Sequence, residues 1–501
     1  MKKTTLSKKL LAVYLLFFIG LSTNVFAQVG IGTVTPDPSS VLEVFSTTQG
    51  MLTPRMTTAQ RTAIVTPADG LIVYDTELKS FYHYNSSLTS WSRMSSDANG
   101  RLKFKRIKST DVLATVLAAE KTAGGNTKYL LDTGTLYEMN GTIVFDLPIE
   151  LNNAYVDGLD SGEDKLVKTS GDLFTGTTGG SIKGLTISVT GGGNVFNIIG
   201  PGAIGAQTQT LIFRDCIVAN SSNVGKIENF SMMFMSIVQF SGNTNGIIYK
   251  DIRRLLISNV AWFGNNSGTF ETLQGTFDLV QKNGGFSGVT GAAIGFDVSA
   301  NPTIVADAVV NEVVFAGTFT TGKYVNGYTI GSYPGFSFDN QWSVRSSGVP
   351  SEGDSYASGN LYLDRTVASP TIQLSTTGTV YKIPGTTIST NLYRMDGATN
   401  NRLVYLGKKP RTFTATASVS FEGGSGTTDV LFFFVKYDSL GAATNITSSE
   451  TFIDSNTTSV QSFPVTGTVS LASGEYVQLC AKRINGSNKI FTIRSYNMSM
   501  K

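Results

Sequence analysis

The residues that most often carry out chemistry in proteins are scarce in this chain. Its 501 residues include one histidine, His83, and two cysteines, Cys216 and Cys480. No serine or cysteine motif stands beside His83 in SFYHYNSS, so the sequence excludes Ser-His-Asp, Cys-His and histidine-rich zinc chemistry. The two cysteines fall in segments that we assign to different domains, and we expect both to be buried free thiols. We therefore predict no metal site, no cofactor and no catalytic residue.

Carboxylates are the remaining groups that could act on a substrate, as the acid and base of a glycosidase or as calcium ligands. The candidates are Asp157, Asp160, Glu163 and Asp164 in the loop DGLDSGEDK, and Asp215, Asp251, Asp278 and Asp297 further on. A solvated turn accounts for the first group, and the second group is scattered. Asp251 precedes Arg253 and Arg254, which suggests a surface ion pair. A polysaccharide hydrolase or lyase remains an alternative function.

Aromatic side chains offer a different chemistry, the stacking of sugar rings without catalysis. They gather in a segment rich in Gly, Tyr and Ser, residues 323–354. The candidate ligand-binding residues are Trp262, Tyr324, Tyr328, Tyr333 and Trp342. The competing interpretation is that the aromatic residues of this segment cover the open end of a solenoid core.

Composition indicates an all-β protein. The chain holds 53 glycines, only 15% charged residues and a formal net charge of +3. This charge is too small for nucleic-acid binding through counterion release. The basic stretch RLKFKRIK, residues 101–108, alternates charged and apolar residues and is interpreted as one face of a strand.

Residues 1–27 have the pattern of a secretory signal peptide. Four lysines precede an apolar run at residues 10–21, and Val25, Phe26 and Ala27 form a small-residue cleavage site. The run is short for a membrane span, and an uncleaved anchor is the alternative. We expect a secreted or outer-surface protein after cleavage near Ala27, without a later membrane span.

Residues 28–95 form an N-terminal module. Thr57 or Thr58 is a suitable N-cap for a short helix reaching residues 61–64, and strands are expected at 71–74 and 81–84. The GIG at residues 30–32 is not a nucleotide-binding fingerprint, because no strand precedes it and no helix follows it.

Several sequence motifs of this module resemble those of a known protein module. VGIGT-x-TP-x-PS-x-x-LEV, PRMTTAQR and PADGLIVYDT resemble a module at the N-terminus of exported bacterial surface proteins and of phage tail-fibre-like proteins. The resemblance covers about the first seventy mature residues. It implies a trimeric, fibre-like attachment unit and no chemistry. No self-cleaving chaperone domain of the kind found in that family is recognisable at the C-terminus.

A linker at residues 96–130 carries one predicted helix, residues 109–125, capped by Ser109 or Thr110 and ended by Gly124 and Gly125. Strand-like segments then recur over residues 131–322. Their apolar anchors are Leu185, Leu211, Met233, Leu255, Phe277, Ile294 and Val313. These anchors recur at intervals of roughly twenty residues, a period that predicts a solenoid, here a right-handed parallel β-helix. A Greek-key sandwich is the alternative. The strand sequences GLTI and LLISNVAWF also resemble the rungs of pectate-lyase-like and phage tailspike folds.

Two further parts complete the chain. Residues 323–391 are predicted to be an exit cap and connector, and residues 392–501 a jelly-roll β-sandwich. Residues 411–421, RTFTATASVSF, alternate as a half-buried strand does, and residues 430–437 are expected to be fully buried. The strand order resembles the tumour-necrosis-factor-like head of trimeric fibres. An immunoglobulin-like or carbohydrate-binding sandwich is the alternative.

Together these features predict an exported homotrimer that recognises a surface polysaccharide or a cell-surface component. The function expected is that of a non-catalytic, fibre-like adhesin. A purely structural surface or appendage subunit is a further alternative, without a concave aromatic site.

Overall fold

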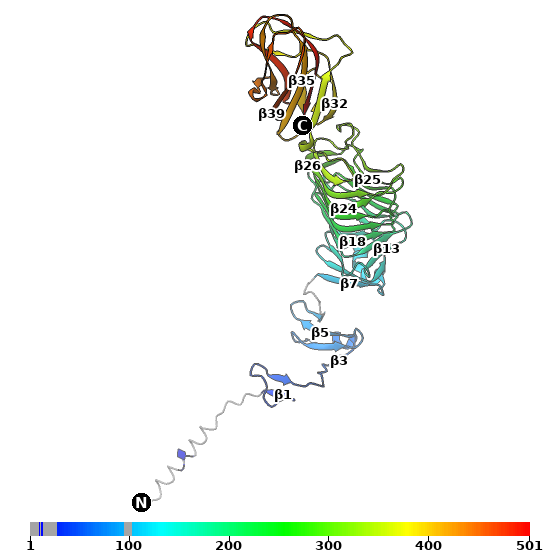
Figure 1. The fold of residues 1–501 in the computed structure, drawn as a ribbon. Coiled ribbons are helices and arrows are strands. Elements are labelled where there is room, and N and C mark those ends of the chain that lie inside the picture. Colours follow the sequence, from blue (N-terminus) through cyan, green and yellow to red (C-terminus); the bar gives the residue numbers. More distant parts are fainter. Residues whose placement is uncertain (1–9, 11, 14–27, 95–102) are drawn as a thin grey trace, which may run out of the picture. The chain divides into compact units, whose positions relative to one another are not determined.

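The computed structural model describes residues 10, 12–13, 28–94 and 103–501. Almost all of the predicted signal peptide lies outside these residues. The chain divides into two compact units, residues 1–101 and 102–501, which are described separately (Figure 1). None of the described helices is long and apolar enough to cross a membrane.

The N-terminal unit consists of two small sheets. Strands β1 (Val29–Ile31) and β2 (Leu42–Val44) form a parallel pair. A second sheet has the order β3 (Arg55–Met56), β4 (Ile72–Asp75), β5 (Ser80–Asn85) and β6 (Ser90–Arg93). Helix α2 (Thr58–Thr62) starts at Thr57, whose side chain forms a capping box with Gln60, and this confirms the predicted helix start.

The C-terminal unit begins with β7 (Phe104–Lys108), so the described part of the basic stretch is a strand, as predicted. Lys105 Nζ lies 2.6 Å from Glu120 Oε1. The predicted helix of residues 109–125 is instead two short helices, α3 (Leu113–Val116) and α4 (Ala118–Ala123). Leu117 separates them because it is fully buried and adopts non-helical angles, φ −108° and ψ 28°. Neither Ser109 nor Thr110 caps them, whereas α4 does end at Gly124.

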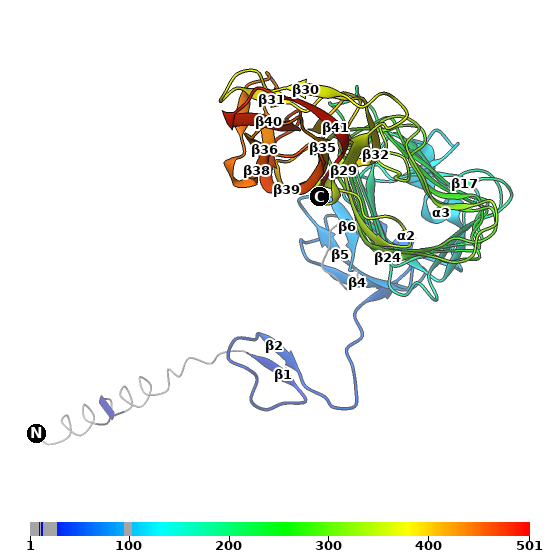
Figure 2. The ribbon, with the colours of Figure 1, turned by 45° about the horizontal axis from the view of Figure 1, so that its top comes forward.

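A parallel β-helix follows, with two sheets that run along its length (Figures 1 and 2). Sheet I contains β7, β9 (Leu136–Asn140), β10 (Thr142–Val144), β12 (Tyr155–Gly158), β13 (Lys165–Lys168), β15 (Gly180–Lys183), β16 (Thr186–Val189), β18 (Thr210–Ala219), β20 (Met232–Ser241), β22 (Arg254–Trp262), β24 (Thr276–Gly288), β26 (Thr303–Ala316) and β28 (Trp342–Ser347). Sheet II contains β8 (Tyr129–Leu130), β11 (Ile149–Glu150), β14 (Phe174–Gly176), β17 (Asn194–Ile199), β19 (Asn223–Glu228), β21 (Asn245–Lys250), β23 (Thr269–Gln274), β25 (Ile294–Asp297) and β27 (Lys323–Asn326). The paired strands thus extend beyond the predicted range of 131–322 on both sides.

The interior of the β-helix is filled by side chains stacked from rung to rung. The predicted anchors Leu211, Met233 and Leu255 are in register on successive strands and are fully buried. Trp262 stacks between Phe240 and Phe270, with centroid distances of 3.9 and 5.0 Å. Of the seven predicted anchors, only Ile294 is not fully buried.

One corner of the β-helix carries a short ladder of buried asparagines. Asn266 accepts hydrogen bonds from the backbone N–H and the side chain of Asn243, at 3.0 and 2.9 Å. Its own amide donates to the carbonyl oxygens of Phe240 and Phe263, both at 2.7 Å. Asn243 in turn accepts from the backbone of Ser221 at 3.0 Å. The ladder therefore satisfies backbone groups where the chain turns between the sheets.

The C-terminal part is an antiparallel sandwich of two sheets. One sheet contains β29 (Ser358–Leu363), β30 (Thr371–Gln373), β32 (Thr387–Tyr393), β35 (Arg411–Glu422), β39 (Val460–Leu471) and β41 (Ile490–Met500). The other contains β31 (Val380–Lys382), β33 (Met395–Asp396), β34 (Leu403–Tyr405), β36 (Thr428–Tyr437), β37 (Ala443–Asn445), β38 (Thr451–Ser455) and β40 (Tyr476–Gly486). Short 3-10 turns lie at η1 (Asp354–Tyr356) and η2 (Thr447–Ser449).

This sandwich confirms the all-β prediction for the C-terminal part. The alternation predicted for residues 411–421 appears in β35. The full burial predicted for residues 430–437 holds only in part, because Leu431, Lys436 and Tyr437 are partly exposed. Cys216 and Cys480 are both buried free thiols, as predicted. The predicted connector, residues 323–391, is not a separate part of the fold: β27 and β28 belong to the β-helix, and β29 to β32 belong to the sandwich.

Candidate functional site

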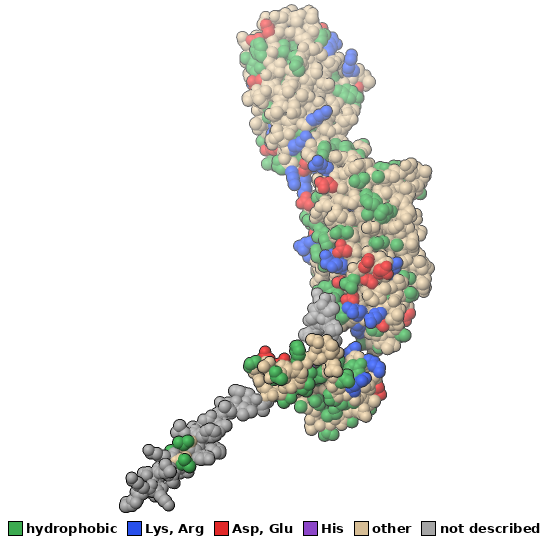
Figure 3. Space-filling model, turned by 60° about the horizontal axis from the view of Figure 1, so that its bottom comes forward, with side chains coloured by type: hydrophobic (Ala, Val, Ile, Leu, Met, Phe, Trp, Pro, Cys, Tyr) green, Lys and Arg blue, Asp and Glu red, His purple; other side chains and the backbone are tan. Residues whose placement is uncertain are grey.

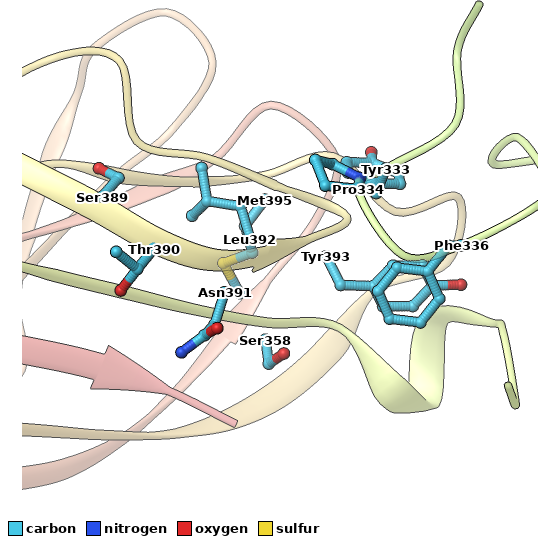
Figure 4. A pocket seen from close by; sticks show the side chains of 10 residues that line it. All are labelled: Tyr333, Pro334, Phe336, Ser358, Ser389, Thr390, Asn391, Leu392, Tyr393 and Met395. Atoms are coloured by element: carbon cyan, nitrogen blue, oxygen red, sulfur yellow. The ribbon is translucent and has the colours of Figure 1, made fainter. Parts of the chain in front are cut away.

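A pocket of about 510 Å³ lies where the last turn of the β-helix meets the sandwich (Figure 4). Its walls come from the segment between β27 and β28 and from the end of β32. The lining residues are Tyr333, Pro334, Phe336, Ser358, Ser389, Thr390, Asn391, Leu392, Tyr393 and Met395.

Three aromatic rings form one wall of the pocket. Phe336 stacks on Tyr393 with a centroid distance of 3.9 Å, and Tyr333 meets Tyr393 edge to face at 5.3 Å. Tyr393 is 2% exposed, whereas Tyr333 and Phe336 are partly exposed. The buried ring therefore holds two rings that a ligand can reach.

Hydrogen bonds fix this wall from behind. The Tyr393 hydroxyl accepts from the Gly353 N–H at 2.7 Å, and the Tyr333 hydroxyl donates to Asn340 Oδ1 at 3.1 Å. Burial raises the pKa of Tyr393 to about 12, so its phenol is neutral at physiological pH. Both rings are held in one orientation, and this preorganisation lowers the entropic cost of binding a ligand.

Polar groups line the end of the pocket opposite the rings. Figure 4 shows Ser358, Ser389, Thr390 and Asn391 there, away from Tyr333 and Phe336. The Ser389 hydroxyl donates to the Gly397 carbonyl at 2.7 Å. Asn391 is exposed and has a left-handed backbone, with φ of 54°. An aromatic wall facing hydroxyl and amide groups suits a ligand that has both apolar faces and hydroxyls.

Two carboxylates near this pocket hold backbone in place. Glu352 is 1% exposed and accepts from the N–H groups of Ser337 and Phe338, at 2.8 and 3.1 Å. Asp354 Oδ1 accepts from Arg394 at 2.6 Å and from the backbone N–H of Lys408 at 3.0 Å. Burial raises the pKa of Glu352 to about 7. Because these oxygens already serve the protein backbone, the pair has the bonding of a structural clamp.

The structure corrects most of the predicted binding residues. Trp262 is 0% exposed in the β-helix interior, and Trp342 is 1% exposed. Tyr328 is 7% exposed and accepts from the Trp342 indole N–H at 2.9 Å. Tyr324 is partly exposed, and its hydroxyl donates to the Gly317 carbonyl at 2.9 Å.

Tyr333 is thus the only one of the five that lines this pocket. The predicted binding role does not fit Trp262, Tyr328 and Trp342, because their side chains are buried in the core. The pattern did not identify Phe336 and Tyr393, although Phe336 follows Tyr333 in the notable run YPGFSF.

The carboxylates singled out in the sequence do not meet at one place. Asp164 accepts from the N–H groups of Gly141, Leu159 and Asp160, which makes its loop a structural turn. Asp251 accepts from the Thr276 N–H. Asp251 lies 3.9 Å from Lys250 Nζ, so it does have a cationic partner, whereas Arg253 pairs with Asp278 at 2.8 Å.

The remaining candidates lie singly on the β-helix. Asp297 accepts from the Ser299 N–H, and Asp215 lies 3.9 Å from Arg214. Asp157, Asp160 and Glu163 stay with Asp164 in or beside its loop. Among the described residues, no group of histidine, cysteine and carboxylate side chains is placed to hold a metal ion.

Comparison with known proteins identifies one region of the chain. Residues 30–110 match the family described as "Phage tail like trimerisation region". No curated protein matches the chain significantly in sequence.

Solved structures of phage tailspikes resemble the chain only distantly. The enzymatically active domain of bacteriophage CBA120 tailspike protein 4 is 10% identical, with 90% of this chain and 77% of that one covered and a TM-score of 0.23. The Acinetobacter phage vB_ApiP_P1 tailspike is 8% identical, with 90% and 98% covered and a TM-score of 0.26. The phiAB6 tailspike, solved with oligosaccharides of Acinetobacter baumannii surface polysaccharide, is 10% identical, with 84% and 97% covered and a TM-score of 0.25. The chain thus has a region, residues 30–110, that matches the trimerisation family, a parallel β-helix and an antiparallel sandwich.

Proposed function

We propose that this protein is an exported, homotrimeric, fibre-like attachment protein that binds a surface polysaccharide through the pocket between β-helix and sandwich. The observation that carries the binding role is the aromatic wall of Tyr333 and Phe336 on the buried ring of Tyr393. Sugar rings present apolar C–H faces that stack on aromatic rings, and their hydroxyls bond to polar side chains. The polar end of the pocket, with Ser358 and Asn391, supplies the second kind of contact.

The trimeric state is supported by the exposed surface of the N-terminal unit. Among residues 28–94, Val73 is the only buried hydrophobic residue. Val34, Leu52 and Val65 are 98%, 81% and 84% exposed, and Figure 3 shows hydrophobic side chains spread over this unit. A two-stranded sheet without a core is marginal by itself, so we infer that other copies cover these side chains.

Attachment is favoured over catalysis by the use of the carboxylates. Glu352 and Asp354 lie beside the pocket wall, but backbone N–H groups and Arg394 occupy their oxygens. A trimer carries three copies of each pocket, so modest affinity at one site gives firm attachment through multivalency.

An array of purified bacterial surface polysaccharides, probed with the full mature chain, tests this function. We expect retention on at least one polysaccharide, and we expect Phe336→Ala to weaken it about tenfold or more, as loss of a central aromatic contact does. Tyr362→Ala is the matched control, because Tyr362 is an exposed tyrosine of β29 outside the pocket. Equal loss in both variants, or binding unaffected by Phe336→Ala, would place recognition elsewhere.

A further inference from the structure

The two sheets of the β-helix differ in what they present outward. On sheet I, Ile212, Phe234 and Leu256 are in register on β18, β20 and β22. All three are partly exposed, while their neighbours along each strand, such as Leu211 and Leu255, fill the interior. Sheet I therefore carries an apolar row on the face that points away from its own core.

Further apolar side chains lie around this row, together with the polar row Arg214, Ser236 and Ser258. Met232 and Leu279 lie beside the apolar row on β20 and β24 and are also partly exposed. Beyond the bend in these strands, Phe263 is 39% exposed and meets Phe286 edge to face at 5.2 Å. Outward positions of a solvated sheet are normally polar, so this group of exposed apolar side chains favours a covered surface.

The bend itself adds a second observation. Each long strand of sheet I passes through a left-handed residue there: Asp215, Ile237, Asn259, Gly284 and Glu312, with φ between 51° and 64°. Left-handed backbone is strained for a residue with a side chain, and a β-branched residue is the least suited to it. Ile237 is nevertheless found there, and its side chain is 55% exposed. An exposed isoleucine kept in a strained position is best explained by a contact with another surface.

Sheet II is more polar on its outward face. The outward register row Asn197, Lys226, Ile248, Thr272 and Asp297 has one apolar member, and Asn194, Asn223 and Asn245 form a register row beside it. All of these side chains except Asn197 line a groove of about 520 Å³. A monomeric shaft would give no reason for this difference between two faces of one solenoid.

We propose that the outer face of sheet I, around Phe234, Leu256 and Ile237, packs against the other two copies of this chain, and that sheet II faces outward. The region that matches the trimerisation family ends at residue 110 and includes β7, the first strand of sheet I. The contacts between copies proposed for that region would therefore continue onto the same sheet. The inference rests on the trimer of the proposed function and adds the orientation of the shaft within it.

Single cysteine variants test this orientation in the intact protein. The native thiols Cys216 and Cys480 are buried, so maleimide labelling reports an introduced cysteine. Leu256→Cys places the probe on sheet I, and Thr272→Cys is the matched control on sheet II, since both parent residues are partly exposed. Light scattering of each variant measures the number of chains independently of the labelling rate.

We expect a trimer in which Leu256→Cys is labelled about tenfold more slowly than Thr272→Cys, because access limits thiol reactivity. A short bifunctional maleimide on Ile237→Cys should then link chain to chain. Equal labelling rates in a confirmed trimer would overturn the proposed orientation while leaving the trimer intact. A monomer would overturn both the trimer and the proposed orientation. Slow labelling of Leu256→Cys without links between chains would show that something other than a second copy covers this face, and would overturn the proposed orientation.

Discussion

Lys282 Nζ lies 2.5 Å from Glu271 Oε2 inside the β-helix, where the two side chains are 1% and 0% exposed. They come from β23 of sheet II and β24 of sheet I, and the ring of Tyr249 is also buried in the same interior. Burial, and after it the charge of Glu271, raises the pKa of Tyr249. Taking both charges out of water is costly, so each depends on the other for its stability.

Removing one charge of this pair should therefore destabilise the fold far more than removing both. We expect Lys282→Met to lower the free energy of unfolding by about 3–5 kcal/mol, because it leaves an uncompensated buried carboxylate. The double variant Glu271→Leu with Lys282→Met should recover most of that loss. Denaturant unfolding of the wild type, both single variants and the double variant measures the coupling. Additive losses would show that the two side chains do not depend on each other.

The asparagine ladder gives a second stability prediction. Asn266→Ala should cost about 2–3 kcal/mol, since it leaves buried carbonyl and N–H groups of the turn without partners. Asn265→Ala is the control, because Asn265 is the exposed neighbour on the same turn. Thermal unfolding measures the midpoint temperatures of the two variants. Similar midpoints would contradict a structural role for the ladder.

The clamp formed by Glu352 should make stability depend on pH. Its pKa is raised by burial from 4.5 to about 7, with Asp339 adding to the increase and Arg394 opposing it. The folded state therefore holds the proton more tightly than the unfolded chain. The contribution of Glu352 to stability is full below about pH 4.5 and is lost as the pH rises towards 7.

Unfolding measurements across this pH range compare the wild type with Glu352→Gln. The variant cannot titrate at this position, so its stability should change less between pH 4.5 and 7 than that of the wild type. Matching pH profiles for the two proteins would show that another group causes the dependence.

The two native thiols should be unreactive in the folded protein. Burial raises the pKa of both Cys216 and Cys480 to about 12, so little thiolate forms at neutral pH. A chromogenic thiol reagent should react with neither thiol in native buffer and with both after denaturation. Rapid reaction of one thiol in native buffer would show that the fold opens around it.

The repeated pattern of the middle segment was sufficient to predict the β-helix, because each rung buries every second residue. The same alternation also places Trp262 inside, two positions after the buried Val260. Choosing it as a ligand contact followed its residue type and ignored its face. The helix break at Leu117 was not predictable in this way, because Leu117 belongs to the core of the β-helix, which forms from segments far apart in sequence. The pocket was missed for a similar reason: Phe336 and Tyr393 lie far apart in sequence, and only the packing of sandwich on solenoid brings their rings together.

Tyr393→Phe separates the two roles of the pocket wall. The substitution keeps the ring against Phe336 but removes the hydroxyl, which accepts from Gly353 behind the wall and does not face the polar end of the pocket. A buried N–H left without its acceptor costs about 1–3 kcal/mol, so the free energy of unfolding should fall by that amount. Polysaccharide binding should persist at temperatures where the variant is folded, because Tyr333 and Phe336 still present their rings. Loss of binding at unchanged stability would show instead that the Tyr393 hydroxyl contacts the sugar, and that the ligand reaches deeper than the two outer rings.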